Sequence, residues 1–159
     1  MDRPAALEAW ALTAQQDKRR VLILCTGNSA RSQMAEGLLR HMGGTQFEVF
    51  SAGTKPVGVN ALAIEAMREV GIDISKQRSK SVGEFDGQEF ATVITVCDNA
   101  AEECPIFPGA PQRAQWSLPD PAAVSGPRAE KLVAFRKVRD ELEHRIRSLV
   151  NSVASGEHR

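Results

Sequence analysis

The sequence predicts an α/β fold, a three-layer sandwich in which a four-stranded parallel sheet carries helices on both faces. Short apolar or β-branched runs alternate along the chain with segments whose apolar residues recur at helical spacing. The first run, residues 21–24, is apolar throughout, as in a strand of a parallel sheet buried on both sides. Right-handed crossovers between such strands would place the helices on the two faces.

The same patterns predict the elements in order. Residues 33–40 follow the first strand as a helix with Met34 and Leu38 on its apolar face. Residues 47–51 form a second strand, and residues 59–70 a helix that stops at Gly71. The later elements are a helical turn at 81–85 capped by Ser81, a central strand at 91–96, a short strand at 114–117 with Trp116, and a long amphipathic helix at 128–153 lying on the sheet.

The chain of 159 residues suits one domain with its own core. We expect an N-terminal extension without assigned function at 1–19, the domain at 20–154 and a tail at 155–159. Twenty basic residues balance twenty acidic ones, so neither nucleic acid nor an anionic membrane is an expected partner. Residues 1–20 contain no long apolar run, so we expect no signal peptide, no membrane span and a cytoplasmic protein. Three cysteines in that reducing compartment favour chemistry over structural disulfides.

The turn between the first strand and the first helix consists of Cys25, Thr26, Gly27, Asn28, Ser29, Ala30, Arg31 and Ser32. A strand, a turn of small residues and a helix start bring backbone N–H groups together around an anion, so we expect the turn to bind an oxyanion. Gly27 and Asn28 tolerate the left-handed angles that such a turn needs. The helix start and Arg31 would stabilise a Cys25 thiolate, and Arg31 can hold two oxygens of a tetrahedral oxyanion. Ser32 can donate to the sulfur. The alternative is a buried cysteine that ends a strand before a helix-capping turn.

The second and third cysteines, Cys97 and Cys104, follow the strand at 91–96. Cys97 would emerge at the same sheet edge as Cys25. Residues 98–103 favour a helix, whose rise of about 1.5 Å per residue places the two Cα atoms roughly 10 Å apart. A disulfide needs them within about 7 Å, so bridging the pair would unwind the segment. The alternative is a core cysteine and an inert buried thiol. No zinc site is expected, because no histidine or fourth thiolate lies nearby.

The turn resembles the phosphate-binding loop of the low-molecular-weight protein tyrosine phosphatase family, and the resemblance covers about residues 20–150. Within that family, residues 28–36 (NSARSQMAE) resemble the arsenate reductases more than the phosphatases. The spacing Cys97-x6-Cys104 resembles the shuttle pair of the thioredoxin-coupled arsenate reductases. The resemblance implies a phosphatase-like fold, thioredoxin as the electron donor and no bound cofactor.

Asp120-Pro121 resembles the Asp-Pro loop of the family, whose aspartate protonates the leaving group in phosphatases and assists proton transfer in reductases. The alternative is an exposed turn aspartate. The family's phosphatases usually carry a tyrosine after that proline. Here the residue is Ala122, and the chain has no tyrosine. This departure argues against a phosphotyrosine substrate and for arsenate, with phosphate or sulfate as analogues.

The resemblance implies a relay of three cysteines. Cys25 attacks arsenate, Cys97 attacks Cys25 to release arsenite, and Cys104 attacks Cys97 to leave a disulfide that thioredoxin reduces. Two alternatives stay open. One is a phosphatase, with Cys97 and Cys104 protecting Cys25 from oxidation; residual phosphatase activity is also compatible with a reductase. The other is a non-catalytic oxyanion-binding or redox-sensing module.

Four further residues match positions that hold a potassium ion in some arsenate reductases: Asn28, Glu36, Ser51 and Asp73. The alternative is that they are hydrogen-bonding residues that stabilise the loop and the helix. No metal is predicted.

Overall fold

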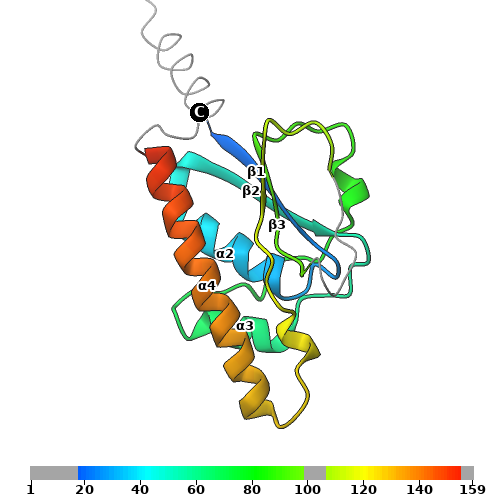
Figure 1. The fold of residues 1–159 in the computed structure, drawn as a ribbon, viewed down its shortest axis with the longest axis vertical. Coiled ribbons are helices and arrows are strands. Elements are labelled where there is room, and N and C mark those ends of the chain that lie inside the picture. Colours follow the sequence, from blue (N-terminus) through cyan, green and yellow to red (C-terminus); the bar gives the residue numbers. More distant parts are fainter. Residues whose placement is uncertain (1–17, 99–106, 155–159) are drawn as a thin grey trace, which may run out of the picture.

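The computed structural model describes residues 18–98 and 107–154 (Figure 1). Four parallel strands form one sheet in the order β2-β1-β3-β4. The strands are β1 (Arg19–Cys25), β2 (Phe47–Gly53), β3 (Thr92–Thr95) and β4 (Gln112–Gln115). The α-helices are α2 (Arg31–Gly43), α3 (Ala61–Arg68) and α4 (Arg128–Ala154), and the 3-10 helices are η1 (Gly44–Gln46), η2 (Val82–Phe85) and η3 (Pro121–Ala123). The predicted α/β class and four-stranded parallel sheet are confirmed.

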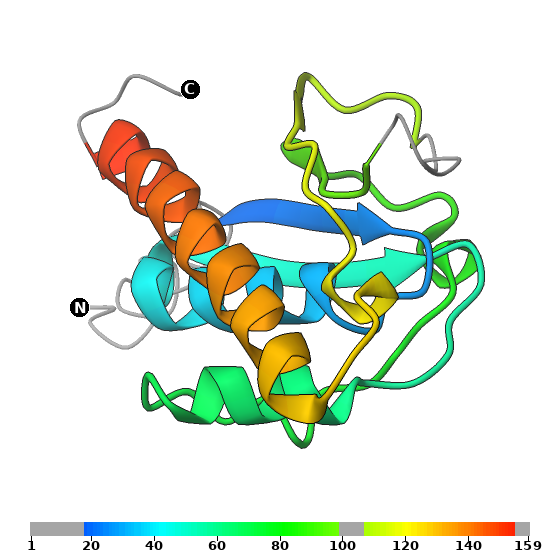
Figure 2. The same ribbon diagram turned by 60° about the horizontal axis from the view of Figure 1, so that its bottom comes forward.

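One face of the sheet packs against the α-helices. Val21 and Ile23 of β1 share a core with buried residues of α2, α3 and α4. Figure 2 shows α2 and α3 on the same side of β1 and β2, and Figure 1 shows α4 crossing both helices. The apolar stripe of α4 has five buried residues: Leu132, Phe135, Val138, Leu142 and Ile146. The long helix at 128–153 is therefore confirmed, and its stripe covers α2 and α3 besides the sheet.

The other face of the sheet carries a second core around Leu22 and Leu24. Its cover is aromatic: Phe50, Phe85, Phe90 and Phe107 form edge-to-face pairs with ring centroids 5.5–5.8 Å apart. In the described part of the chain, the helix on this face is the short η2, with loops beside it. Ser81 caps η2 as predicted, because its side chain accepts a hydrogen bond from the N–H of Gly83.

Two predicted boundaries need adjustment. The helix predicted at 59–70 is α3, which begins after Asn60 because the Asn60 side chain accepts from the N–H groups of Leu62 and Ala63. The fourth strand was predicted at 114–117 and lies at Gln112–Gln115 instead. It is an edge strand whose residues alternate between half-buried and exposed positions, so it lacks the apolar signal that located Trp116.

The register of the sheet brings the ends of three strands together. Cys25, the last residue of β1, pairs with Gly53, the last residue of β2. On the other side of β1, Leu24 pairs with Thr95 of β3. Functional side chains from several segments can therefore lie close together at the carboxyl edge of the sheet. Within residues 18–98 and 107–154, no helix combines the length and apolar content needed to cross a bilayer.

An ion-pair cluster joins α3 to α4 and predicts acid sensitivity. Glu69 accepts hydrogen bonds from Arg136 and Arg139, at 2.7 Å and 2.8 Å for the shortest contact to each. Hydrogen bonds from Arg136 and then Arg139 lower the pKa of Glu69 from 4.5 to about 2. Because the folded pKa lies below the unfolded one, the stabilisation is complete above pH 4.5 and is lost as the pH falls towards about 2.

We therefore expect Glu69→Gln to make the thermal unfolding midpoint less dependent on pH under acidic conditions. Between about pH 5 and pH 2, the unfolding midpoint of the unmodified chain should fall more steeply than that of the variant, which has no carboxylate to protonate at this position. Calorimetry across that range measures both curves. Parallel curves for the two proteins would show that Glu69 does not contribute.

Candidate active site

The loop between β1 and α2 lies at the carboxyl edge of the sheet. It begins at Cys25, a buried free thiol, and reaches the helix at Arg31. Asn28 has φ of +44° and is the one residue other than glycine with a positive φ in the described part of the chain. Asparagine is among the few residues that adopt this conformation readily. The predicted left-handed turn is present at Asn28, while Gly27 does not need a positive φ.

Two polar groups lie against the Cys25 sulfur. The N–H of Asn28 donates to it at 3.2 Å, and Ser32 Oγ lies 2.8 Å from it. Ser32 Oγ also accepts a hydrogen bond from Asn28 Nδ2 at 2.8 Å. That bond uses only one of the two lone pairs of the hydroxyl, so Ser32 can either donate to the Cys25 sulfur or accept from its thiol. Ser32 and the N–H of Asn28 could both donate to a Cys25 thiolate.

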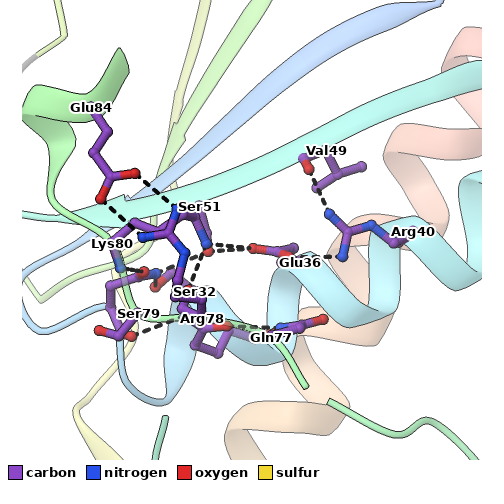
Figure 3. A network of polar contacts seen from close by, with 12 residues as sticks. Ser32, Glu36, Arg40, Val49, Ser51, Gln77, Arg78, Ser79, Lys80 and Glu84 are labelled. Carbon is purple, nitrogen blue, oxygen red and sulfur yellow. Dashed lines mark hydrogen bonds and ion pairs between the residues drawn. The ribbon is translucent and has the colours of Figure 1, made fainter. Parts of the chain in front are cut away.

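A buried polar network supports the loop from below (Figure 3). Asn28 Nδ2 donates to Ser51 Oγ at 2.9 Å, and Ser51 donates to Glu36 Oε1 at 2.5 Å. Asn28 Oδ1 accepts from the N–H of Lys80 at 2.7 Å. Gln33 Nε2 donates to the carbonyl of Asn28 at 3.1 Å. In the described residues, no buried side-chain nitrogen or oxygen lacks a hydrogen-bond partner, so the loop has a fully satisfied support.

Gly53 lies against the main chain of the same loop. A Cβ atom there would lie 2.9 Å from the nitrogen of Asn28 and 3.0 Å from the carbonyl oxygen of Cys25, and would also clash with the carbonyl of Thr26. Only a residue without a side chain allows β2 and the loop to approach this closely.

Arg31 and Asp120 lie together at the start of α2. Arg31 is 4% exposed and donates to the carbonyl of Leu118 at 3.1 Å. Its Nη2 lies 3.8 Å from Asp120 Oδ2. Asp120 caps η3 by accepting from the N–H of Ala122 at 3.0 Å, and its side chain is 40% exposed. The predicted acid and the predicted oxyanion-binding arginine are therefore neighbours, although 89 positions separate them in the sequence.

Cys97 lies beside the end of β1. The N–H of Val96 donates to the carbonyl of Leu24 at 2.9 Å, and Cys97 is fully buried. The carbonyl of Cys97 accepts from Gln115 Nε2 at 3.0 Å. Cys97 thus follows its strand at the same edge as Cys25, as the sequence predicts. Cys104 and the proposed helix before it fall largely in 99–106, outside the described residues, so their arrangement stays a prediction.

The four residues matched to a potassium site do not fit that ion. The Asn28 side-chain oxygen accepts the N–H of Lys80, and the Ser51 hydroxyl donates to Glu36. Cationic groups already balance Glu36, with Arg40 Nη1 at 2.8 Å and Lys80 Nζ at 3.7 Å. Asp73 instead accepts from Ser75, whose hydrogen bonds lower the pKa of Asp73. Among the described residues, no group of three or more acidic, cysteine or histidine side chains is placed to hold a metal.

Comparison with known proteins places this site in a family. Residues 20–158 match the family described as low molecular weight phosphotyrosine protein phosphatase. The arsenate reductase of Halalkalibacterium halodurans is 43% identical over 136 residues, covering 86% of this chain and 98% of that protein.

Solved structures agree with the sequence match. A structure described as an arsenate reductase in the phosphate binding state has a TM-score of 0.69 and 31% identity, covering 84% of this chain and 98% of its own. The thioredoxin-dependent arsenate reductase of Corynebacterium glutamicum has a TM-score of 0.69 and 28% identity, covering 98% of this chain and 71% of that one. The loop geometry, the parallel sheet and these matches agree, and the chain belongs to the low-molecular-weight phosphotyrosine protein phosphatase family.

Proposed function

We propose that this chain reduces arsenate to arsenite and takes its electrons from thioredoxin. The observation that carries the proposal is the buried Cys25 thiol, which lies between the Asn28 N–H and the Ser32 hydroxyl at a helix start. The similarity to the Halalkalibacterium halodurans reductase and to the thioredoxin-dependent Corynebacterium glutamicum enzyme supports the choice of substrate and donor.

The first step is attack by the Cys25 thiolate on arsenic. Arsenate is a tetrahedral oxyanion, which the N–H groups of residues 26–32 and the Arg31 guanidinium would bind. Asp120, beside Arg31, donates a proton so that one arsenate oxygen leaves as water. The product is an arsenylated Cys25. Phosphate and sulfate have the same shape and charge, so they should compete for the loop, and the similarity to a reductase structure in a phosphate binding state supports this.

The second step moves two electrons to arsenic. The Cys97 thiolate attacks the Cys25 sulfur, the new S–S bond forms, and the As–S electron pair stays on arsenic, which leaves as arsenite. Cys104 then attacks Cys97 and returns Cys25 as a thiol. Thioredoxin reduces the Cys97–Cys104 disulfide and becomes oxidised itself. The placement of Cys97 at the strand edge beside Cys25 supports the first of these exchanges.

A phosphatase is the second candidate function, because the same nucleophile, arginine and aspartate would cleave a phosphate ester. The family description favours it. Against a protein phosphotyrosine substrate stands Ala122, which follows the Asp-Pro pair and offers no aromatic surface. A non-catalytic redox-sensing module would use the same cysteines without turnover.

One assay separates the reductase from the other two functions. With arsenate, thioredoxin, thioredoxin reductase and NADPH, the reductase should oxidise NADPH in proportion to arsenate, whereas the phosphatase and the sensing module should not. Cys104→Ser should release one arsenite per chain and stop at a Cys25–Cys97 disulfide. Cys97→Ser should release none and hold an arsenylated Cys25.

Two outcomes would contradict the relay. Turnover by Cys104→Ser with thioredoxin at the rate of the unmodified chain would make the third cysteine dispensable. Sustained turnover in a variant lacking both Cys97 and Cys104 would instead indicate a single-cysteine enzyme served by a small thiol. Mass spectrometry of the trapped species identifies the disulfide in each case.

A further inference from the structure

A buried carboxylate, Glu36, lies beneath the candidate active site. Its side chain is 4% exposed. An ionised carboxylate at such a depth is costly unless cations and hydrogen bonds compensate it. Ser51 supplies the hydrogen bond, and Arg40 and Lys80 supply the charge (Figure 3).

The two cations differ in their surroundings. Arg40 follows Glu36 by one helical turn and its side chain is 54% exposed, so water screens it. The Lys80 side chain is only 12% exposed, and its Nζ also donates to the carbonyl of Arg78 at 2.6 Å. Burial lowers the pKa of Lys80, and the Glu36 carboxylate opposes that shift. The buried ammonium and the buried carboxylate therefore depend on each other.

Lys80 is also fixed to the loop support through its main chain. Its N–H donates to Asn28 Oδ1 at 2.7 Å, and its carbonyl accepts from the N–H of Gly53 at 2.9 Å. Lys80 thus joins the two residues, Asn28 and Gly53, that shape the Cys25 loop. The main chain that carries the ammonium is therefore itself part of the support of the loop.

A chain of hydrogen bonds connects Glu36 to the sulfur of Cys25. Because ionised Glu36 can only accept, the Ser51 hydroxyl donates to it and accepts from Asn28 Nδ2. The second hydrogen of Asn28 Nδ2 goes to Ser32 Oγ. Ser32 Oγ in turn lies 2.8 Å from Cys25 Sγ. A displacement of Glu36 would therefore pass through Ser51 and Asn28 to the groups that contact the sulfur.

We propose that Lys80 is a positioning residue whose ammonium acts as an internal monovalent cation, which holds Glu36, Ser51 and Asn28 in place beneath Cys25 without a bound potassium ion. The proposal rests on the proposed function only in taking Cys25 as the reacting thiol. It also gives a reason for the poor fit of a potassium ion at Asn28, Glu36 and Ser51, because a cation from the chain itself already lies there.

The test compares Lys80→Met with the unmodified chain in potassium chloride and in choline chloride of equal ionic strength. The readout is the rate at which iodoacetamide alkylates Cys25 at neutral pH, followed by peptide mass spectrometry, which does not require arsenate turnover. In choline chloride, Lys80→Met should react about tenfold more slowly, a factor that corresponds to roughly 1.4 kcal/mol. Potassium should restore most of the rate, because the space left by the ammonium can then hold the ion.

Three controls keep the result specific. Lys76→Met removes an exposed lysine from the same segment and should behave as the unmodified chain in both salts. Lys80→Arg keeps the charge and should retain most of the rate. The unmodified chain should react equally fast in both salts. This comparison does not depend on whether any variant folds.

Several results would overturn the proposal. The unmodified chain reacting faster in potassium chloride would show that Lys80 does not fill the cation position. Lys80→Met reacting like Lys76→Met in choline chloride would show that the ammonium has no influence on Cys25. A loss that neither potassium nor Lys80→Arg restores would leave Lys80 with a role in the fold alone. Failure of arsenate reduction with the alkylation results intact would affect the proposed function and not Lys80.

Discussion

Replacing Cys25 with serine should abolish arsenate-dependent oxidation of thioredoxin and hydrolysis of a small aryl phosphate, each by at least about 10⁴-fold. The loop places the Asn28 N–H and the Ser32 hydroxyl against the sulfur, where both could donate to the attacking thiolate. A serine hydroxyl at this position stays protonated at neutral pH and is a poor nucleophile. In the proposed mechanism both reactions begin with attack by the Cys25 sulfur, so both should fail together.

The variant must be shown to be folded, and phosphate binding measured by calorimetry provides that check. Because Arg31 and the loop N–H groups remain, Cys25→Ser should still bind inorganic phosphate within a few-fold of the unmodified chain. Ser148→Ala, an exposed serine on α4, is the matched control for activity. Undiminished aryl phosphate hydrolysis by Cys25→Ser would remove Cys25 as the nucleophile. Loss of one activity alone would show that the two reactions use different groups.

The elements of the fold could be predicted where local sequence carries their signal. The run at 21–24 is buried on both faces of the sheet, and the stripe on α4 is buried by the core on one of them, so hydrophobic patterning reports both elements directly. The sequence places β4 two residues too late. An edge strand is held by main-chain hydrogen bonds to β3, and those bonds leave little trace in the type of its side chains. The cover of the second sheet face depends on how four scattered phenylalanines meet, which no local pattern encodes.

The positions of the three candidate active-site residues Cys25, Arg31 and Asp120 could be predicted because each borders a recognisable local feature. Cys25 and Arg31 flank a strand–turn–helix junction, and Asp120 precedes a proline in a turn. Lys80 carried no such signal. It lies in a polar segment, and its partner Asn28 is 52 positions away in the sequence. Burial of a lysine beside a carboxylate on another element arises from tertiary packing, so residue type and spacing could not reveal it.

Gly53 likewise carries no local signal of the main chain that it faces, and its substitution should have the second-largest effect. Gly53→Ala would press a methyl group against main-chain atoms of Cys25, Thr26 and Asn28. Because these atoms belong to the backbone, no rotation of a side chain relieves the contact. Either β2 or the loop must shift, which should lower the free energy of unfolding by about 1–3 kcal/mol. A shift of about 1 Å at the nucleophile should lower kcat by about 100-fold.

Gly83→Ala is the matched control, since neither glycine has a positive φ and only the space around them differs. A Cβ at Gly83 would meet only Ser81 Oγ, at 3.6 Å, so this variant should change the free energy of unfolding by less than about 1 kcal/mol and leave kcat unchanged. Denaturant unfolding gives the stability of each variant, and kcat measured well below both unfolding midpoints counts only folded molecules. Equal stability and equal kcat in the two variants would show that the loop accommodates the methyl group. A stability loss at Gly53 with kcat intact would place the displacement in β2, and a loss of both would place it in the loop that holds Cys25.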